Sequence, residues 1–148
     1  MRYISPISFF FWSRKNFSAI FKQCTLPNGK KIAWFSDASG EYQLMIGDQE
    51  GLEKPKVISF EKPTFFFKPA WSPDGKYISF TDTDYNLWFA DVATGISKKV
   101  DKERYAHPNR SLNPVWSPDS KWISYSRLLD NHFKVIKVYK ISELYLNT

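Results

Sequence analysis

The sequence predicts an all-β fold, a partial β-propeller of about three four-stranded blades, from three observations. A block built around Trp-Ser-Pro-Asp recurs with a spacing of 45 residues, counted as 116 − 71. Each copy has the pattern of strand, tight turn and strand, with apolar side chains alternating at period two. Helical periodicity is almost absent from the chain. Four-stranded units repeated every 40 to 50 residues or so are typical of propeller blades.

The repeat is clearest between residues 69–80 and 114–125. Pro-Ala-Trp-Ser-Pro-Asp-Gly-Lys-Tyr-Ile-Ser-Phe in the first stretch becomes Pro-Val-Trp-Ser-Pro-Asp-Ser-Lys-Trp-Ile-Ser-Tyr in the second. A weaker copy lies upstream, although Thr25 and Leu26 stand where Trp and Ser are expected. The repeats of the predicted propeller, residues 27–148, therefore run near 27–68, 69–113 and 114–148.

Local chemistry supports each element of the repeat in turn. In Ser72–Gly75, proline pre-sets φ for a turn and glycine accepts the left-handed conformation that often follows. Ile78 and Phe80 then share one face of the next strand. One position on the opposite face holds a small side chain in every copy: Ala33, Ser79 and Ser124. We expect this position to let a neighbouring sheet approach closely.

Two further strands complete each predicted blade. Leu87 with Phe89, and Ile136 with Val138, mark an alternating third strand, and a turn at 91–95 leads to a short outer strand. Three blades are fewer than the four to eight with which propellers usually close. We therefore expect an open stack, which is a fragment of a larger ring or one part of an oligomeric ring.

Residues 1–26 form an atypical basic and aromatic segment. They contain four basic residues and no acidic one, so they carry +4 of the net charge of +6. A secretory signal is disfavoured by Pro6 and by the lack of a small-residue cleavage site. The segment could also be an arm that binds a membrane surface or a remnant of a further repeat. We favour the remnant. We expect a cytoplasmic protein, or a periplasmic or secreted one if the segment is a signal.

Charge and cysteine content exclude several classes of protein. Residues 27–148 hold 17 basic against 15 acidic groups, so no basic surface for nucleic acid is predicted. No apolar run approaches the roughly 20 residues that span a bilayer, and there is no firm membrane signal. Cys24 is the single cysteine, which excludes an internal disulfide and a Cys-rich zinc site.

Residues that could carry chemistry are few, and we predict no catalytic, cofactor-binding or metal-binding residue. His107 and His132 are the two histidines, and no G-x-S-x-G motif surrounds any serine. Asp130, Asn131 and His132 offer too few ligands to define a metal geometry. Cys24 is interpreted as an incidental thiol because the sequence places no His or Cys near it.

The aromatic residues divide into two groups. Most of the repeated tryptophans are expected to pack between blades: Trp34, Trp71, Trp88, Trp116 and Trp122. The run Phe65–Phe67 leads into the second repeat and could be a buried strand or an exposed patch that contacts peptides. The sequence does not assign the binding residues beyond this.

The Trp-Ser-Pro-Asp blocks resemble the WD40-like repeats of TolB, prolyl-oligopeptidase-type enzymes and tricorn proteases. Other stretches resemble the N-terminal propeller of tricorn-type proteases: 36–37, 40–44, 86–88, 91–95, 100–101, 104–105 and 131–132. The resemblance covers about residues 27–141. It implies a large serine peptidase in which this propeller filters or channels peptides to a separate catalytic region. No residue here matches that region's catalytic motifs.

Two functional hypotheses of different classes follow. The first is a non-catalytic propeller segment that gates peptides for a tricorn-like peptidase, with peptides or the rest of the peptidase as partners. The alternative is a TolB-like scaffold for protein interaction that completes its ring by self-association. A weaker third hypothesis is a non-functional gene remnant.

Overall fold

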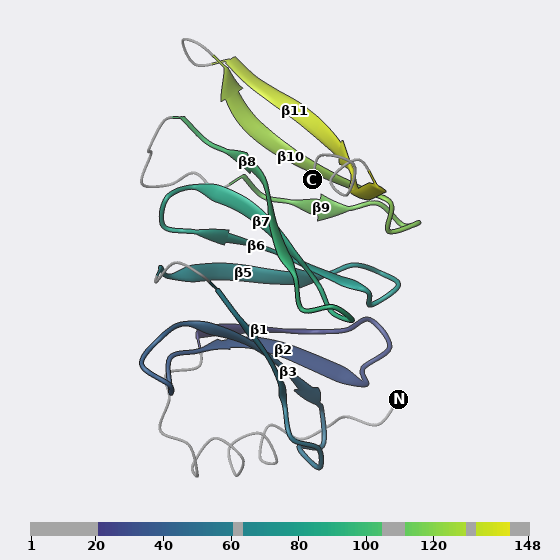
Figure 1. The fold of residues 1–148 in the computed structure, drawn as a ribbon. Coiled ribbons are helices and arrows are strands. Elements are labelled where there is room, and N and C mark those ends of the chain that lie inside the picture. Colours follow the sequence, from purple (N-terminus) through teal and green to yellow (C-terminus); the bar gives the residue numbers. More distant parts are fainter. Residues whose placement is uncertain (1–20, 61–63, 105–111, 130–132, 143–148) are drawn as a thin grey trace.

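The computed structural model describes residues 21–60, 64–104, 112–129 and 133–142, and within these ranges the chain is all-β with no α-helix. Its strands form antiparallel sheets stacked one on another (Figure 1). The first sheet contains β1 (Phe21–Thr25), β2 (Lys31–Ser36), β3 (Gln43–Asp48) and β4 (Lys56–Ser59). The second contains β5 (Phe66–Trp71), β6 (Tyr77–Asp82), β7 (Asn86–Asp91) and β8 (Ser97–Lys102). The third contains β9 (Val115–Trp116), β10 (Trp122–Leu129) and β11 (Phe133–Lys140).

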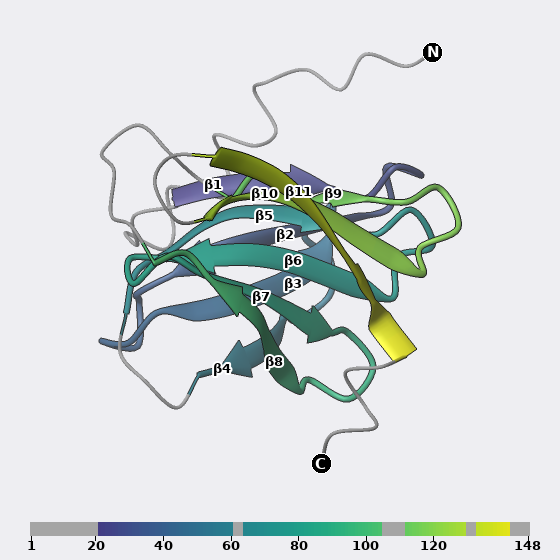
Figure 2. The same cartoon turned by 90° about the horizontal axis from the view of Figure 1, so that it is seen from above.

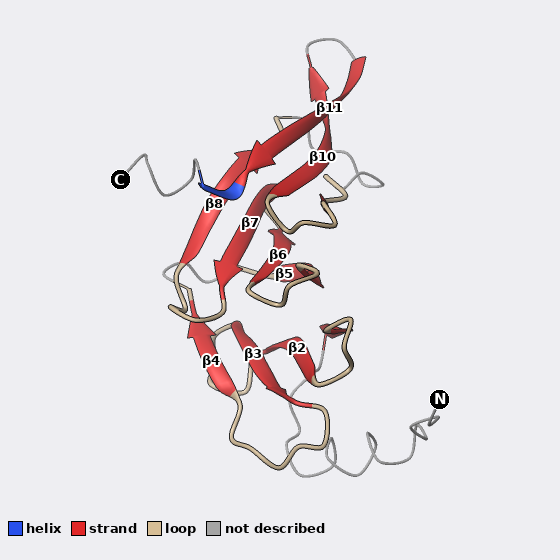
Figure 3. Ribbon diagram, turned by 90° about the vertical axis from the view of Figure 1, so that its right-hand side faces the viewer, coloured by secondary structure: helices blue, strands red, loops and turns tan. Residues whose placement is uncertain are grey.

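Strands within each sheet are neighbours in sequence and in space. The orders are β1-β2-β3-β4, β5-β6-β7-β8 and β11-β10-β9, so the first strand of every repeat lies at one edge. Seen from above, β1, β5 and β9 lie toward the same side of the stack, and β4 and β8 lie toward the other (Figure 2). The sheets are twisted and do not close into a ring (Figure 3). This is the predicted partial propeller, with three strands described in the third blade.

The first blade begins earlier than the boundary at residues 26 and 27 that the sequence analysis drew. β1 pairs with β2 in the register Cys24↔Ala33 and Thr25↔Ile32. Pairing uses backbone groups, so the strand forms although Thr25 replaces the tryptophan of the other copies. Residues 1–20 lie outside the described residues.

The repeated turn is held by its serine and aspartate side chains. In the second repeat, the Gly75 N–H donates to the Ser72 carbonyl at 2.9 Å, and the Ser72 hydroxyl donates to Asp74 Oδ1 at 2.7 Å. The Tyr77 N–H in turn donates to Ser72 Oγ at 2.9 Å. Gly75 has a φ of 72° and Ser120, its counterpart in the third repeat, has a φ of 59°. Ser120 therefore adopts a left-handed conformation that usually favours glycine.

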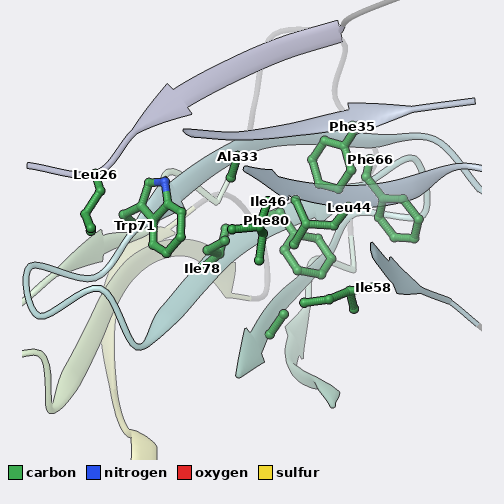
Figure 4. Close-up of a cluster of buried hydrophobic side chains, with 11 residues drawn as sticks. Leu26, Ala33, Phe35, Leu44, Ile46, Ile58, Phe66, Trp71, Ile78 and Phe80 are labelled. Atoms are coloured by element: carbon green, nitrogen blue, oxygen red, sulfur yellow. The ribbon is translucent and has the colours of Figure 1, made fainter. Parts of the chain in front are cut away.

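Each hydrophobic core lies between two sheets rather than within one. Side chains of the first and second sheets form one cluster (Figure 4), which includes Phe35, Leu44, Phe66 and Phe80. A second cluster joins the second and third sheets: Leu87, Phe89, Val100, Leu112, Ile123, Tyr125 and Ile141. Ala33 and Ser79, at the small-residue position, are fully buried. The predicted close approach of neighbouring sheets at this position is confirmed.

Candidate functional site

The repeated tryptophans join consecutive sheets by hydrogen bonds. The Trp71 indole N–H donates to the Cys24 carbonyl at 3.2 Å, and that of Trp116 donates to the Ala70 carbonyl at 3.2 Å. Cys24 and Ala70 lie on β1 and β5, the first strands of their sheets. Each of these tryptophans therefore contacts the sheet that precedes it, as expected for packing between blades. Trp122 differs, because it lies on an exposed face of the third sheet.

A charged cluster links the outer strand of the second sheet to the third sheet. Arg127 Nη1 lies 2.9 Å from each carboxylate oxygen of Asp101, and the Tyr125 hydroxyl donates to Asp101 Oδ2 at 2.7 Å. Lys137 Nζ approaches the same oxygen at 3.4 Å. Burial raises the pKa of Asp101, but the Tyr125 hydrogen bond, the Lys102 N–H and the two cations outweigh it and hold that pKa below its usual range. This carboxylate is therefore an anion at neutral pH.

The same cluster raises the pKa of the Tyr125 hydroxyl through burial and through the hydrogen bond to Asp101. A phenol in this setting stays protonated and donates its hydrogen. Asp101 on β8 and Tyr125 on β10 face each other across the interface between the second and third sheets. We interpret the cluster as structural.

Exposed aromatic side chains gather where the second sheet begins. Phe65 is 54% exposed and Phe67 is 40% exposed, whereas Phe66 between them is 3% exposed and belongs to the core. Tyr42, from the connection between β2 and β3, packs on Phe65 with ring centroids 4.8 Å apart. We call Tyr42, Phe65 and Phe67 the aromatic ledge. The middle residue of this run is therefore buried and its two neighbours are exposed, whereas contact with peptides stays a prediction.

A cationic side chain lies beside the aromatic ledge in an unusual backbone conformation. Lys68 has a φ of 52°, and Asn113, at the same position of the next repeat, has a φ of 44°. The Lys68 ammonium donates to Asn113 Oδ1 at 3.3 Å, which joins β5 to the segment before β9. Both lie at the edge of the stack that the first strands form, which we call the inner edge. Left-handed conformations at residues other than glycine cost free energy and are concentrated at functional sites. The inner edge therefore combines apolar surface, a cation and backbone strain.

The remaining perturbed groups are explained by local structure. Burial raises the pKa of the Cys24 thiol to about 12, so it stays protonated and is a poor nucleophile. The hydroxyl of Ser117 and the N–H of Lys121 lower the pKa of Asp119. Burial raises the pKa of Asp74, but its equivalent hydrogen bonds outweigh that effect and lower it. These two carboxylates stabilise the repeated turns.

Several residues weighed from the sequence cannot be placed. His107, Asp130, Asn131 and His132 lie outside the described residues. Among the residues that are described, no three His, Cys, Asp or Glu side chains form a group that could hold a metal ion. In the same part of the chain, we find no apolar helix of membrane-spanning length. The aromatic ledge was identified in sequence only as the run Phe65–Phe67, since Tyr42 reaches it through the fold.

Comparison with known proteins gives a match to part of a larger protein. No family model matches the sequence. The Tol-Pal system protein TolB of Xanthomonas oryzae pv. oryzae (strain PXO99A) is 32% identical over 97 residues. The alignment covers 58% of this chain and 21% of the relative. The chain thus spans about a fifth of the length of this curated relative.

Solved structures with the same arrangement of strands include two of the types of propeller that the sequence resembles, TolB and tricorn. A putative TolB from Agrobacterium tumefaciens superposes with a TM-score of 0.58 at 18% identity, over 85% of this chain and 45% of that one. The tricorn protease superposes with a TM-score of 0.62 at 19% identity, over 78% of this chain and 11% of that one. At these identities the similarity establishes the propeller fold and does not separate the two types.

Proposed function

Because this chain has a TolB-like β-propeller fold, we propose that it is a non-catalytic interaction module that binds extended peptide segments of protein partners. The observation that carries the proposal is the aromatic ledge on the inner edge of the stack. Phe67 pairs with Thr81 in the sheet and Phe65 packs on Tyr42, yet the two side chains are 40% and 54% exposed. Apolar patches of this kind mark sites of interaction.

The chemistry of the ledge suits a peptide better than a small polar substrate. Aromatic rings supply large, rigid contact area at a low cost in side-chain entropy. The ammonium of Lys68 adds a positive charge at the end of this surface, beside Asn113. We therefore propose that the preferred peptides carry apolar side chains followed by an acidic group or a free carboxyl terminus.

A second, more specific candidate is the gating role in a tricorn-like peptidase. It rests on the seven sequence stretches that resemble tricorn propellers, and the superposition with the tricorn protease is compatible with it. The TolB-like relative supports a scaffold role at least equally. Both candidates predict peptide binding without hydrolysis by this chain, and the gating role further requires a peptidase that binds it.

The compartment belongs to the same proposal. The sequence predicts a cytoplasmic protein, or a periplasmic or secreted one if residues 1–26 are a signal. Similarity to proteins of the Tol-Pal system favours the periplasmic alternative. Fractionation of cells that make the full-length protein, followed by immunodetection, would distinguish the two compartments.

The peptide-binding proposal is tested with fluorescently labelled peptide libraries and the full chain. Replacing one anchoring aromatic residue of an interface typically weakens binding about tenfold or more, so we expect Phe65→Ser and Phe67→Ser to do so. Ile96→Ser is the matched control, because Ile96 is 54% exposed but lies in the turn before β8. Equal affinities for wild type, Phe65→Ser and Ile96→Ser would refute the ledge as the binding site.

A further inference from the structure

The third sheet lies at one end of the stack (Figure 1). Its outward face exposes apolar side chains. Ile136 is 78% exposed, Val115 is 61% exposed and Val138 is 57% exposed. The strand register places Ser124 opposite Val138 and Ser126 opposite Ile136, so these residues share one face of β10 and β11. We call Val115, Trp122, Ser124, Ile136 and Val138 the third-sheet face.

The corresponding apolar residues of the second sheet are covered by the third sheet. There, Ser79 pairs with Phe89 and Thr81 pairs with Leu87, in the same arrangement as on β10 and β11. Phe89 and Leu87 are 1% and 0% exposed and pack against the third sheet. Val138 and Ile136 are their counterparts. The repeat therefore places apolar residues at positions that are core one blade earlier.

The second sheet also shows what the covering blade contributes. The Trp116 indole N–H donates to Ser79 Oγ at 3.0 Å and to the Ala70 carbonyl at 3.2 Å. These two acceptors are themselves joined, since the Ser79 hydroxyl lies 3.4 Å from the Ala70 carbonyl. Tyr77 stacks on the Trp116 ring, with centroids 6.0 Å apart and planes 14° apart. One tryptophan thus occupies a site formed by Ala70, Ser79 and Tyr77, which we call the tryptophan seat.

The third sheet repeats that seat. Its Ser124 hydroxyl lies 3.3 Å from the Val115 carbonyl, the same pairing that Ser79 and Ala70 make. Trp122 takes the place of Tyr77, two residues before the serine, and carries the Lys140 ammonium 5.5 Å from its ring centroid. All three components that receive Trp116 in the second sheet are therefore present in the third.

We propose that the third-sheet face is a docking surface for one further propeller blade of the Trp-Ser-Pro-Asp type, supplied by polypeptide outside this 148-residue sequence. The tryptophan of that blade donates its indole N–H to Ser124 Oγ and to the Val115 carbonyl and stacks on Trp122. Apolar side chains of its second and third strands cover Val138 and Ile136. The interaction continues the interface already formed between the second and third sheets.

A second copy of this chain does not supply the required tryptophan. The first sheet of such a copy carries Thr25 at the position of the tryptophan. Ile32 and Trp34 stand where Ile78 and Phe80 of the second sheet contact the preceding sheet, and they are already buried, at 5% and 4% exposed. Trp71 and Trp116, which stand at that position in the other sheets, already donate to carbonyls of the preceding sheet. Ring completion by self-association, the alternative that the sequence analysis kept, would therefore place a threonine in a tryptophan seat.

The test supplies such a blade to the full chain. A second copy of residues 64–104, which carries Trp71, is appended to the C-terminus through a flexible linker. Because this copy duplicates the second sheet only, peptides from the third sheet stay unique in mass spectrometry. Hydroxyl-radical footprinting then measures the oxidation rates of Trp122, Ile136 and Val138. We expect the rates of Ile136 and Val138 to fall at least about fivefold relative to the unextended chain, because their counterparts Leu87 and Phe89 are 0% and 1% exposed when covered. The rate of Trp122 should fall less, because its counterpart Tyr77 is only partly buried.

Two matched variants separate docking from nonspecific contact. Trp71→Thr in the appended copy alone reproduces the residue found at Thr25, and Ser124→Lys fills the seat with a charged side chain on a partly exposed position. Both are expected to restore the oxidation rates of the unextended chain. Unchanged rates in the folded extended chain, or equal protection in the Trp71→Thr variant, would overturn the proposal. A dimer of the unextended chain that protects the same residues and is lost in Ile136→Lys would assign the face to a second copy instead.

Discussion

The charged cluster around Asp101 offers a quantitative test of how the blades hold together. Asp101→Asn keeps the size of the side chain but removes the charge that faces Arg127 at 2.9 Å. Breaking a buried ion pair by removing one partner costs about 3 to 5 kcal/mol. The side chains of Asp101 and Arg127 are 15% and 13% exposed, so solvent screens part of the charge. We expect the lower end, a loss of about 3 kcal/mol in the free energy of unfolding.

Two features of the structure favour a measurable loss. Arg127 Nε is buried and has no hydrogen-bond partner among the described residues, so the Asp101 carboxylate compensates most of the cost of burying this guanidinium. The Tyr125 hydroxyl donates to the same carboxylate. The assay is urea unfolding of wild type, Asp101→Asn, Arg127→Met and the double variant. In a double-mutant cycle we expect a coupling energy of about 1 to 3 kcal/mol.

The pH dependence of stability follows from the direction of the pKa shift. The folded pKa of Asp101 lies below its unfolded value, so its contribution is complete above the unfolded pKa of about 4 and is lost as pH falls through the folded pKa. The Asp101→Asn variant lacks this contribution and should lose less stability between about pH 4 and pH 2. A loss below about 1 kcal/mol at pH 7, or parallel acid profiles, would refute the assignment.

The other predictions concern the repeated turn and the tryptophan seat. Gly75→Ala should destabilise the chain by about 1 to 2 kcal/mol. The φ of Gly75 is 72°, and the new Cβ would lie 2.9 Å from Cδ1 of Leu26, the residue that follows β1. Gly40→Ala is its control, with positive φ but open space around the Cβ, and an equal or larger cost there would contradict the steric argument. Trp116→Phe removes the indole donor to Ser79 and should cost about 1 to 2 kcal/mol by thermal or urea unfolding. Trp122→Phe, on the exposed face, should cost less, and the reverse order would contradict the seat.

Part of the candidate site could be predicted from the sequence because its signal is local. The run Phe65–Phe67 stands out as a cluster of aromatic residues, and alternation along a strand implies that its members do not all face the same way. Which of them are exposed depends on the first sheet, which buries Phe66 with Phe80. Tyr42 joins the ledge from a connection more than twenty residues away, and no sequence pattern links it to Phe65.

The all-β class, the period of the repeat and the turns follow from the amino-acid sequence alone, because strand alternation and turn chemistry act between residues close in the chain. The sequence also located the small-residue position of Ser79 and the repeated tryptophans that pack between blades. Which partners meet across blades, such as Asp101 with Arg127, is visible only in the three-dimensional structure. It alone shows that Val138 and Ile136 are exposed where Phe89 and Leu87 are buried, since burial depends on whether another sheet covers that face.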